Sequence, residues 1–311
     1  MISKLAIGTR GSKLALYQAN LVKSKLEIAY STLEVVINVI KTKGDKILDI
    51  ALSKIGDKGF FTKEIQDALY NKEVDIAVHS LKDLPTELPK GSQLGAILER
   101  ANHRDVLVSV GGKKLADFTA EDKIATSSLR RKSQLLQMNK QVQVVEIRGN
   151  VDTRIRKMND GHCEGIIMAA AGIERLGLQE HITEYLNETQ MLTAPGQGAI
   201  AIEIRKEDNE ILEVLSVLNH EQSAICVTAE RSFLNRLEGG CQIPFAAHAT
   251  LDGDNLTVEG LVATLDGRKI QRAKIIGNSK DAIQLGIDLA NSIQYNGGYE
   301  ILEEVKRELN N

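Results

Sequence analysis

One cysteine of this chain stands in a sequence setting that suits chemistry better than packing. Cys241 follows Gly239 and Gly240, and Pro244 comes shortly after it. The glycines remove side-chain cover and permit unusual backbone angles, and the proline cannot extend a helix or a central strand. We predict a loop that presents the thiol as a nucleophile or an attachment point. A structural loop cysteine is the alternative that this spacing leaves open.

Arginines form the second group of candidate residues. Arginine binds carboxylate or phosphate groups through forked hydrogen bonds and does not lose its charge. A single surface arginine is usually only solvated. Several arginines at the carboxyl ends of strands in α/β sheets instead indicate a ligand with several negative charges. The sequence predicts such positions for Arg10, Arg130, Arg131, Arg148, Arg154 and Arg175.

Two predicted strand–turn–helix segments have the same design. The first strand-like run of the chain leads through Arg10 and Ser12 into a helix. The run over 123–125 leads through Thr126 and Ser128 into another helix. A helix N-terminus offers N–H groups and a partial positive charge, so it binds anions. An ordinary helix cap explains each hydroxyl singly, but the repetition favours a paired anion site.

One acidic residue lies among these cations. The apolar run 75–79 is predicted as a buried strand that delivers Ser80, Lys82 and Asp83 to the same edge. A carboxylate among arginines would serve a different part of the ligand, such as a cation or an N–H group. An ion pair between Asp83 and Lys82, or a nearby arginine, is the alternative.

The glycine-rich segment 53–62 precedes a helix and carries Lys54, Lys58 and Phe61. It matches neither the Walker nor the Rossmann glycine pattern. We predict a mobile loop near the ligand, and an inert surface loop is the alternative. No metal site is predicted, because the six histidines are scattered and none has a partner at ligand spacing.

Alternating apolar and amphipathic runs predict the elements that position these residues. Strand-like and helical patterns alternate before residue 99 and again after residue 105, which is typical of α/β domains with largely parallel strands. Small residues over 170–172 predict a turn before Arg175. After residue 222 the pattern is typical of a separate α+β domain. The predicted boundaries are 1–99 with 198–218 for a discontinuous first domain, 105–193 for the second and 222–311 for the third.

Composition narrows the class of protein. The chain has 311 residues, of which 42% are hydrophobic and 26% charged, as in proteins of two or three globular domains. Its net charge of −3, its 4% of aromatic residues and its lack of tryptophan disfavour a nucleic-acid surface. Three widely spaced cysteines favour a reducing compartment. No signal peptide or membrane-spanning run is recognised, so we expect a cytoplasmic protein.

The motifs together resemble those of the porphobilinogen deaminase family, also called hydroxymethylbilane synthase. The resemblance runs from the first arginine turn to the Cys241 loop, and the rest of the chain fits in length and pattern. Departures are mild: Leu81 stands where methionine is common in the family, and Tyr17 where several members carry tryptophan. The matching motifs are Gly8-Thr9-Arg10-Gly11-Ser12, Ala77-Val78-His79-Ser80-Leu81-Lys82-Asp83-Leu84-Pro85, Ser127-Ser128-Leu129-Arg130-Arg131, Ile147-Arg148-Gly149-Asn150-Val151, Ala194-Pro195-Gly196-Gln197-Gly198 and Gly239-Gly240-Cys241.

The resemblance implies a fold and an activity. The fold would comprise two α/β domains like those of periplasmic binding proteins, with the site between them, and a C-terminal α+β domain that carries Cys241. The activity would be that of a transferase in tetrapyrrole (heme) biosynthesis, which joins four porphobilinogen units into hydroxymethylbilane and releases ammonia at each addition. Growth would start on a dipyrromethane cofactor, which the enzyme builds itself and holds through a thioether to Cys241.

The resemblance also implies roles for individual residues. Asp83 would be the catalytic carboxylate that stabilises positive charge on the pyrrole nitrogens. The loop with Lys54, Lys58 and Phe61 would be a flexible lid. Cofactor-binding positions would be Cys241, Ser80, Lys82, Asp83, Thr126, Ser128, Arg130, Arg131, Arg148, Gly149 and Arg154. Positions that bind substrate carboxylates would be Arg10, Ser12, Arg148, Arg154 and Arg175.

Two other classes of function are compatible with the residues. A solute-binding protein for a polycarboxylate would use the same two α/β domains. It gives no reason for a third domain with a Gly-Gly-Cys loop, and it usually carries an export signal. A nucleic-acid binder is disfavoured by charge and aromatic content. We expect a monomer, because no strongly apolar surface stripe demands a dimer. We also expect that the protein binds neither nucleic acid nor membrane.

Overall fold

The structure is a computed structural model that describes residues 2–46, 62–237 and 243–310. These residues form two compact units. The first unit contains the described residues up to 101 together with 198–225, and the second contains 102–197 and the described residues from 226 onward. The predicted division of the second unit into separate domains over 105–193 and 222–311 stays a prediction.

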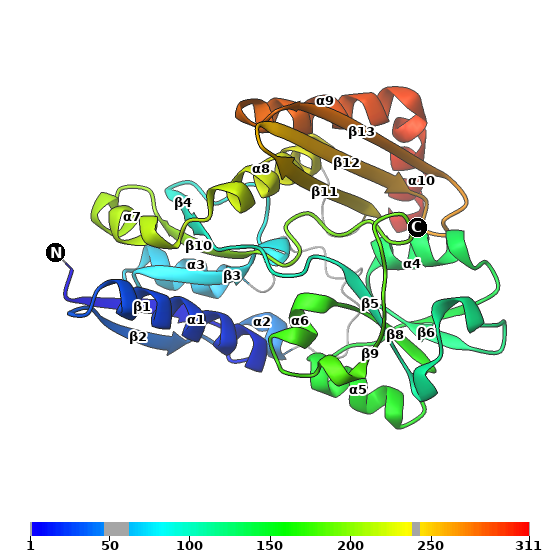
Figure 1. Ribbon diagram of the computed structural model, residues 1–311, viewed down its shortest axis with the longest axis horizontal. Helices are drawn as coiled ribbons and strands as arrows, with labels where there is room; N and C mark the ends of the chain where they lie inside the picture. The colour runs from blue at the N-terminus through cyan, green and yellow to red at the C-terminus, as the bar shows by residue number, and fades with distance from the viewer. Residues whose placement is uncertain (1, 47–61, 238–242, 311) are drawn as a thin grey trace. The chain divides into compact units, whose positions relative to one another are not determined.

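The first unit is built on a five-stranded sheet with the order β2-β1-β3-β10-β4 (Figure 1). β1 is parallel to β2 and β3, but β10 is antiparallel to β3 and β4. The prediction of largely parallel pairing is wrong here, because the chain returns from the second unit and inserts β10 into the interior of the sheet. The strands are β1 (Lys4–Thr9), β2 (Glu34–Val39), β3 (Ile76–Ser80), β4 (Ser92–Ile97) and β10 (Ile200–Arg205).

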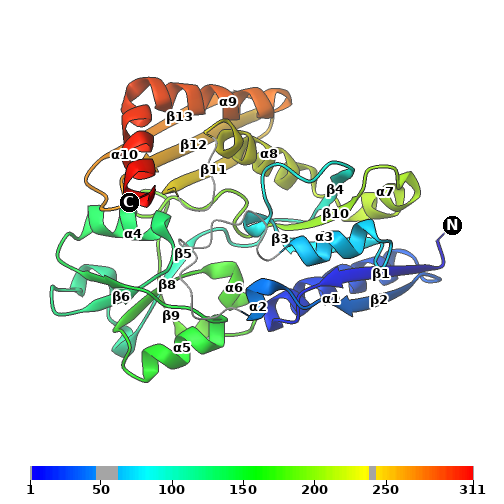
Figure 2. The ribbon, with the colours of Figure 1, turned by 180° about the vertical axis from the view of Figure 1, so that it is seen from behind.

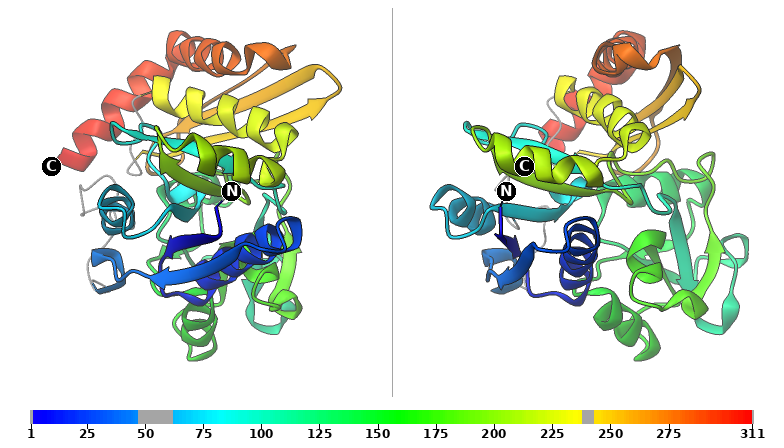
Figure 3. Two further views of the ribbon diagram at one scale, coloured as in Figure 1. Left: turned by 90° about the vertical axis from the view of Figure 1, so that its left-hand side faces the viewer. Right: turned by 60° about the vertical axis from the view of Figure 1, so that its left-hand side comes forward.

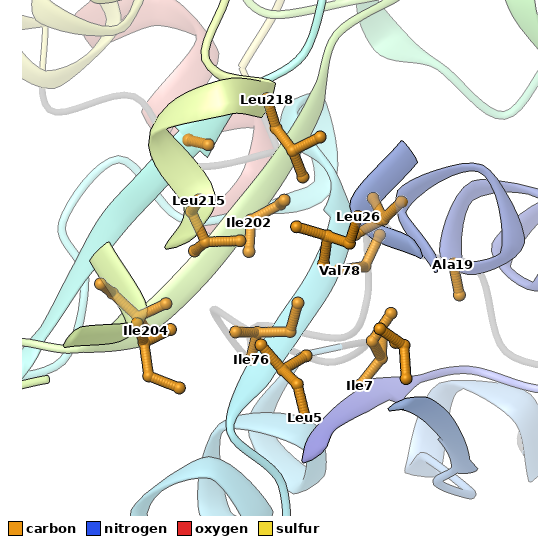
Figure 4. Packing of buried hydrophobic residues seen from close by; sticks show 14 of the residues in the cluster. Leu5, Ile7, Ala19, Leu26, Ile76, Val78, Ile202, Ile204, Leu215 and Leu218 are labelled. Atoms are coloured by element: carbon orange, nitrogen blue, oxygen red, sulfur yellow. The ribbon is translucent and has the colours of Figure 1, made fainter. Parts of the chain in front are cut away.

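Helices cover both faces of this sheet because its strands are apolar on both sides. Successive side chains of a strand point to opposite faces, so Leu5 and Ile7 of β1 pack with α1 while Ala6 packs with α3. The cluster with α1 also receives side chains of β3, β10 and the segment after α7 (Figure 4). The helices are α1 (Lys13–Ala29), α2 (Lys43–Lys46), α3 (Lys63–Tyr70) and α7 (Asn209–Leu215), with 3₁₀ turns η2 (Leu81–Asp83) and η6 (Ser216–Leu218).

The second unit contains a five-stranded sheet with the same pattern of pairing. Its order is β7-β6-β8-β5-β9, in which β6 is parallel to β7 and β8 while β5 is antiparallel to β8 and β9. β6 therefore takes the place that β1 has in the first unit, in agreement with the two matching turns. Strand β9 was not predicted. The strands are β5 (Asp105–Ser109), β6 (Lys123–Ala125), β7 (Gln143–Val145), β8 (Gly165–Ala169) and β9 (Ile182–Tyr185).

Helices also cover both faces of the second sheet. α4 packs on one face through Leu135, and α5 and α6 pack on the other through Ile155 and Ile173. The prediction of a turn over 170–172 is wrong, because the fully buried Ile173 holds this segment against the sheet as a short helix. The helices are α4 (Leu129–Met138), α5 (Val151–Asn159) and α6 (Ala170–Glu174), with 3₁₀ turns η3 (Val110–Gly112), η4 (Leu115–Asp117) and η5 (Gln179–His181).

A three-stranded antiparallel sheet completes the second unit (Figure 2). A Cβ atom on Gly260 would lie 2.7 Å from Phe233 of α8 and 3.1 Å from Leu289 of α9, so both helices cover one face (Figure 3). A Cβ atom on Gly267 would lie 2.1 Å from the carbonyl oxygen of Ser133, so the turn between β12 and β13 touches α4. The elements are α8 (Glu221–Arg236), β11 (Phe245–Asp252), β12 (Asn255–Ala263), β13 (Ile270–Asn278), η7 (Ser279–Asp281), α9 (Ala282–Ile293), η8 (Gln294–Gly298) and α10 (Tyr299–Asn310).

Candidate functional site

Four residues that the sequence singled out lie outside the described part of the chain. They are Cys241, Lys54, Lys58 and Phe61, and their roles as attachment point and lid stay predictions. The other candidate residues are described and divide between the two units. The first unit contains Arg10, Ser12, Ser80, Lys82 and Asp83, and the second contains Thr126, Ser128, Arg130, Arg131, Arg148, Gly149, Arg154 and Arg175.

In the first unit, the turn after β1 is held by a helix cap. Ser12 Oγ accepts a hydrogen bond from the backbone N–H of Ala15 at 3.2 Å, as expected for a cap of α1. Arg10 lies in this turn and is half-buried. The buried Gln18 of α1 donates from Nε2 to Ser80 Oγ at 2.8 Å, at the end of β3. This hydrogen bond joins α1, which follows the first turn, to the end of β3.

Asp83 ends the 3₁₀ turn that follows β3. Leu81 and Leu84 on either side are buried, and the backbone N–H of Leu81 donates to the carbonyl of Ala199 at 3.0 Å. Between these anchors Lys82 is half-buried and Asp83 is exposed. The turn therefore presents the Asp83 carboxylate to solvent from a backbone that packing fixes, which suits a group that acts on a ligand.

A buried polar network supports the strand that leads to this turn. His79 Nε2 of β3 lies 3.1 Å from Oε2 of Glu203 on β10. Glu203 also accepts hydrogen bonds from Gln66 Nε2 at 3.1 Å and from Ser92 Oγ at 2.7 Å. Burial, the largest effect, raises the pKa of Glu203, but the nearby His79 imidazole and the donors outweigh it and lower that pKa overall. The charged carboxylate thus fixes β3 against its neighbours.

In the second unit, hydroxyl groups shape the turn between β6 and α4. Ser128 Oγ accepts a hydrogen bond from the backbone N–H of Arg131 at 3.4 Å, as expected for a cap of α4. Thr126 is almost fully buried, and its Oγ1 accepts from the backbone N–H of Ser128 at 3.2 Å. Ser127 Oγ donates to the carbonyl of Ile147. These contacts join the α4 turn to the segment that carries Arg148.

Gly149 lies in the turn between Arg148 and helix α5, which carries Arg154. Its φ of +119° lies in the region that favours glycine, and a Cβ atom there would lie 2.7 Å from Thr153 Cγ2. Arg154 Nε donates to the carbonyl of Gly149 at 2.8 Å. Arg148 and Arg154 are both half-buried. Arg175, in contrast, is the C-cap residue of α6, one short helix beyond β8.

Asp105, at the start of β5, is a residue that the sequence did not single out. It is fully buried, and Arg130 Nη1 donates to its Oδ2 at 2.7 Å. Arg131 donates to Asp105 Oδ1 from Nε at 3.0 Å and from Nη2 at 2.7 Å, and Gln197 Nε2 donates to the same oxygen at 3.0 Å. The two arginines were predicted to hold adjacent ligand carboxylates. In the structure, the carboxylate that they share is that of Asp105.

The electrostatics of this triad leave positive charge in excess. Burial, the largest effect, raises the pKa of Asp105, but Arg130 and Arg131 hold it well below its usual value. Burial lowers the pKa of Arg130, and the nearby charge of Arg131 acts in the same direction. One carboxylate faces two guanidinium groups, so one positive charge of the triad is left without a negative partner within it. An anionic ligand would complete the balance.

Three other side chains of the second unit have the composition of a metal site. The ligand atoms of His103, Glu188 and His248 lie within 4.8 Å of one another. The two imidazole rings stack, however, with centroids 3.8 Å apart and an interplanar angle of 15°. Imidazole nitrogen binds a metal ion in the plane of its ring, and two nearly parallel planes at this distance cannot both contain one ion. We therefore describe the group as a stacked pair beside Glu188, which the sequence did not reveal.

These turns define the class of protein. Turns with cationic or hydroxyl side chains follow β1 and β3 in the first sheet and β6 in the second, and the turn after β3 also presents a carboxylate. Cationic and hydroxyl groups suit carboxylates of a ligand, and a carboxylate suits an N–H group. The family model for "Porphobilinogen deaminase, dipyromethane cofactor binding domain" matches residues 5–213, and that for "Porphobilinogen deaminase, C-terminal domain" matches residues 224–294. The chain belongs to the porphobilinogen deaminase family.

Curated relatives support this assignment over the whole chain. The porphobilinogen deaminase of Syntrophomonas wolfei is 50% identical over 303 residues, which cover 97% of this chain and 99% of the relative. That of Geobacter sulfurreducens is 48% identical and covers 98% of this chain and 95% of the relative. That of Desulfitobacterium hafniense is 47% identical and covers 99% of each.

Solved structures give weaker similarity. The BvgS periplasmic VFT2 domain of Bordetella pertussis has 13% identity and a TM-score of 0.42, covering 70% of this chain and 86% of that one. An ancestral arginine-binding protein bound to arginine has 14% identity and a TM-score of 0.40, covering 70% of this chain and 92% of that one. The fold class, two α/β sheets with flanking helices and a smaller α+β part, rests on the sheets themselves.

Proposed function

We propose that this chain is a transferase that joins four porphobilinogen molecules head to tail into hydroxymethylbilane, with release of ammonia, on a dipyrromethane primer. The observation that carries the proposal is the match to both family domains, over residues 5–213 and 224–294. Every pyrrole ring of porphobilinogen carries an acetate and a propionate. The growing product therefore accumulates negative charge, which half-buried arginines at fixed turns are suited to bind.

The described residues fit the dipyrromethane cofactor. Its two rings bring four carboxylates, and the triad of Asp105, Arg130 and Arg131 has positive charge in excess. Arg148 and Arg154 share the turn at Gly149 and add two further cations. When bound, the cofactor supplies the pyrrole carbon to which the first substrate unit is joined. We propose that Arg130, Arg148, Arg154, Lys82 and the Ser128 cap hold its carboxylates.

Substrate carboxylates are proposed to bind further along the same turns. Arg10 and the N-terminus of α1, capped by Ser12, provide one anion site in the first unit. Arg175 provides a cation in the second unit. Arg148 and Arg154 would exchange from cofactor to substrate carboxylates as the product lengthens. The lid assigned to Lys54, Lys58 and Phe61 belongs to this proposal as well, on the family resemblance alone.

Asp83 is proposed as the catalytic carboxylate. Loss of ammonia from porphobilinogen leaves an electron-poor methylene-pyrrole, and positive charge develops on pyrrole nitrogen while the new carbon–carbon bond forms. A carboxylate that accepts hydrogen bonds from the pyrrole N–H groups stabilises that charge. Asp83 suits this role because it is exposed on a turn anchored by the buried Leu81.

Cys241 is proposed as the attachment point of the cofactor. The two described cysteines suit that role poorly, because Cys163 and Cys226 are both buried. Burial and the neighbouring Glu164 raise the pKa of Cys163 to about 11, so its reactive thiolate form is scarce near neutral pH. The loop setting of Cys241 behind two glycines supports a thioether there.

We also propose where the chain acts and how many copies assemble. Across the described helices, no segment has the length and hydropathy needed to cross a membrane. We propose a cytoplasmic enzyme on its place in tetrapyrrole biosynthesis and on its few, widely spaced cysteines. We also propose a monomer whose ligand is porphobilinogen and not a nucleic acid, in keeping with a net charge of −3. Light scattering during size-exclusion chromatography would test the monomer.

Incubation of the purified chain with porphobilinogen tests the proposed function. The expected result is one ammonia released for each porphobilinogen consumed and a product with the mass of a linear tetrapyrrole. A solute-binding protein would bind the same ligand by calorimetry without releasing ammonia. Binding without ammonia release would therefore contradict the proposal and favour that alternative.

A further inference from the structure

We infer that Asp105 is a positioning residue, which orients the guanidinium of Arg130 so that one edge of it is presented to a ligand carboxylate. The inference rests on the proposed function only for the identity of that ligand, a carboxylate of the cofactor. Arg130 Nη1 donates to Asp105 Oδ2 at 2.7 Å and to the carbonyl of Leu192 at 2.8 Å. Nη1 donates both hydrogen bonds, and together they fix the plane of the guanidinium.

The two arginines of the triad use different edges. Arg131 donates to Asp105 through Nε and Nη2, the pair that would otherwise grip a ligand carboxylate, and its Nη1 donates to the carbonyl of Ile167 at 3.0 Å. Arg130 bonds through Nη1, and its Nε–Nη2 edge makes no hydrogen bond within residues 2–46, 62–237 and 243–310. A guanidinium edge of this kind forms two parallel hydrogen bonds with a carboxylate. Arg130 is therefore the ligand-binding member and Arg131 the supporting one.

The acceptors that hold Arg130 are themselves fixed. The buried Gln134 donates from Nε2 to the carbonyl of Leu192 at 3.0 Å and accepts from the backbone N–H of Leu192 at 2.8 Å. Gln197 donates to Asp105 Oδ1 at 3.0 Å and to the carbonyl of His103 at 2.7 Å. These bonds hold the Asp105 carboxylate and the Leu192 carbonyl in place, so neither shifts with the Arg130 side chain. The site is thus organised before the ligand arrives, which lowers the cost of binding.

The charge of the triad supports the same assignment. Asp105 neutralises one guanidinium, so the second positive charge is left for an anion. Loss of Asp105 alone would leave two buried cations side by side and would disturb folding as well as orientation. The double variant Asp105→Leu with Arg131→Gln keeps the excess of one positive charge on Arg130 and removes the carboxylate that anchors it. That variant separates positioning from charge balance.

Intact mass spectrometry of the double variant provides the test. We expect a folded protein with a melting temperature close to that of the wild type and at least a tenfold lower fraction of dipyrromethane-loaded chains. Asp122→Asn is the matched control, because it removes a carboxylate paired with Lys113 at 2.6 Å elsewhere in the same unit, and it should load normally. Wild-type loading of the double variant would overturn the inference.

Crystal structures of the unloaded wild type and of the double variant provide a second readout that needs no activity. The inference predicts that Arg130 keeps its contact with the Leu192 carbonyl in the wild type and turns away in the variant. An unchanged guanidinium in the variant would overturn it. A wild type without any adduct would refute the proposed function instead, and the two structures would still decide the role of Asp105.

Discussion

At the scale of single residues, the two most informative carboxylates differ in what satisfies their charge. Asp105 is fully buried, and two arginines and a glutamine occupy its oxygens. Asp83 is exposed on an anchored turn. A carboxylate that is already paired inside the protein organises its partners, whereas one held open to solvent can act on a ligand.

The Asp83 carboxylate should matter more for turnover than for binding. Asp83→Asn keeps the size and one acceptor but removes the charge, so we expect a folded, cofactor-bearing protein whose turnover falls by a factor on the order of 100. Asp83→Glu should retain more activity, limited by its longer side chain. Single-turnover kinetics check this after the adduct mass has been measured. Glu87→Gln removes an exposed charge nearby and is the control. Near-normal chemistry in the Asn variant would reduce Asp83 to a structural ion-pair partner.

Replacing Arg130 by leucine and replacing Arg131 by leucine should have different effects on stability and on cofactor loading. Arg130→Leu leaves a neutral pair of Asp105 and Arg131, so the melting temperature should stay close to that of the wild type while the loaded fraction collapses. Arg131→Leu removes the forked contact to Asp105 and the bond to Ile167, so stability should fall by about 2–5 kcal/mol and loading with it. Chemical denaturation and intact mass measure both quantities. Full loading of both variants would contradict the assigned roles.

Residue patterns revealed the candidate ligand-binding groups better than the groups that support them. Arg10, Arg148 and Asp83 stand out because a charge follows an apolar strand. Asp105 instead begins a strand, and its partners lie 25, 26 and 92 residues away. No local pattern encodes such pairings, since they arise only when the sheet brings distant segments together.

At the scale of elements, tight turns and buried strands hold the site. The turn at Gly149 has a φ of +119° and no room for a Cβ atom beside Thr153. Gly149→Ala should therefore destabilise the protein by more than about 1 kcal/mol and weaken loading, because Arg154 bonds to this turn. Gly161→Ala is the control, with φ +87° but nothing within 4 Å of the added atom. Equal effects of both changes in urea unfolding would show that crowding at Gly149 is unimportant.

The Glu203 network gives a pH prediction for the strand β3. Its folded-state pKa is lowered, so its stabilising effect is present above the unfolded value of about 4.3 and is lost as pH falls through the lower folded value. Glu203→Gln should be less stable at pH 7 and should lose less stability than the wild type on acidification. Thermal unfolding from pH 7 to pH 3 measures the difference. Parallel curves for the two proteins would exclude this role of Glu203.

Element types were largely predictable, but sheet order was not. The helices 129–138 and 13–29 follow from their periodicity and their serine caps. The antiparallel insertion of β10 depends on where the chain returns after the second unit, which periodicity does not report. The short helix α6 looked like a turn because its small residues are compatible with both.

At the scale of the whole chain, the two five-stranded sheets repeat one pattern of pairing, and each offers turns with cationic side chains. The family matches cover residues 5–213 and 224–294, so they include most of the C-terminal part. We propose that this architecture serves one covalently held primer, with Cys241 as its attachment point. Sequence motifs predicted this attachment point, and in the described structure the other two cysteines are buried.

Intact mass spectrometry of the purified chain measures whether Cys241 holds the primer. We expect the wild type, Cys163→Ser and Cys226→Ser each to carry the mass of two pyrrole units beyond the polypeptide. Cys241→Ser should have the bare polypeptide mass and no activity with porphobilinogen. A wild-type chain that is fully active at its unmodified mass, or a Cys241→Ser variant that still carries the adduct, would contradict attachment at Cys241.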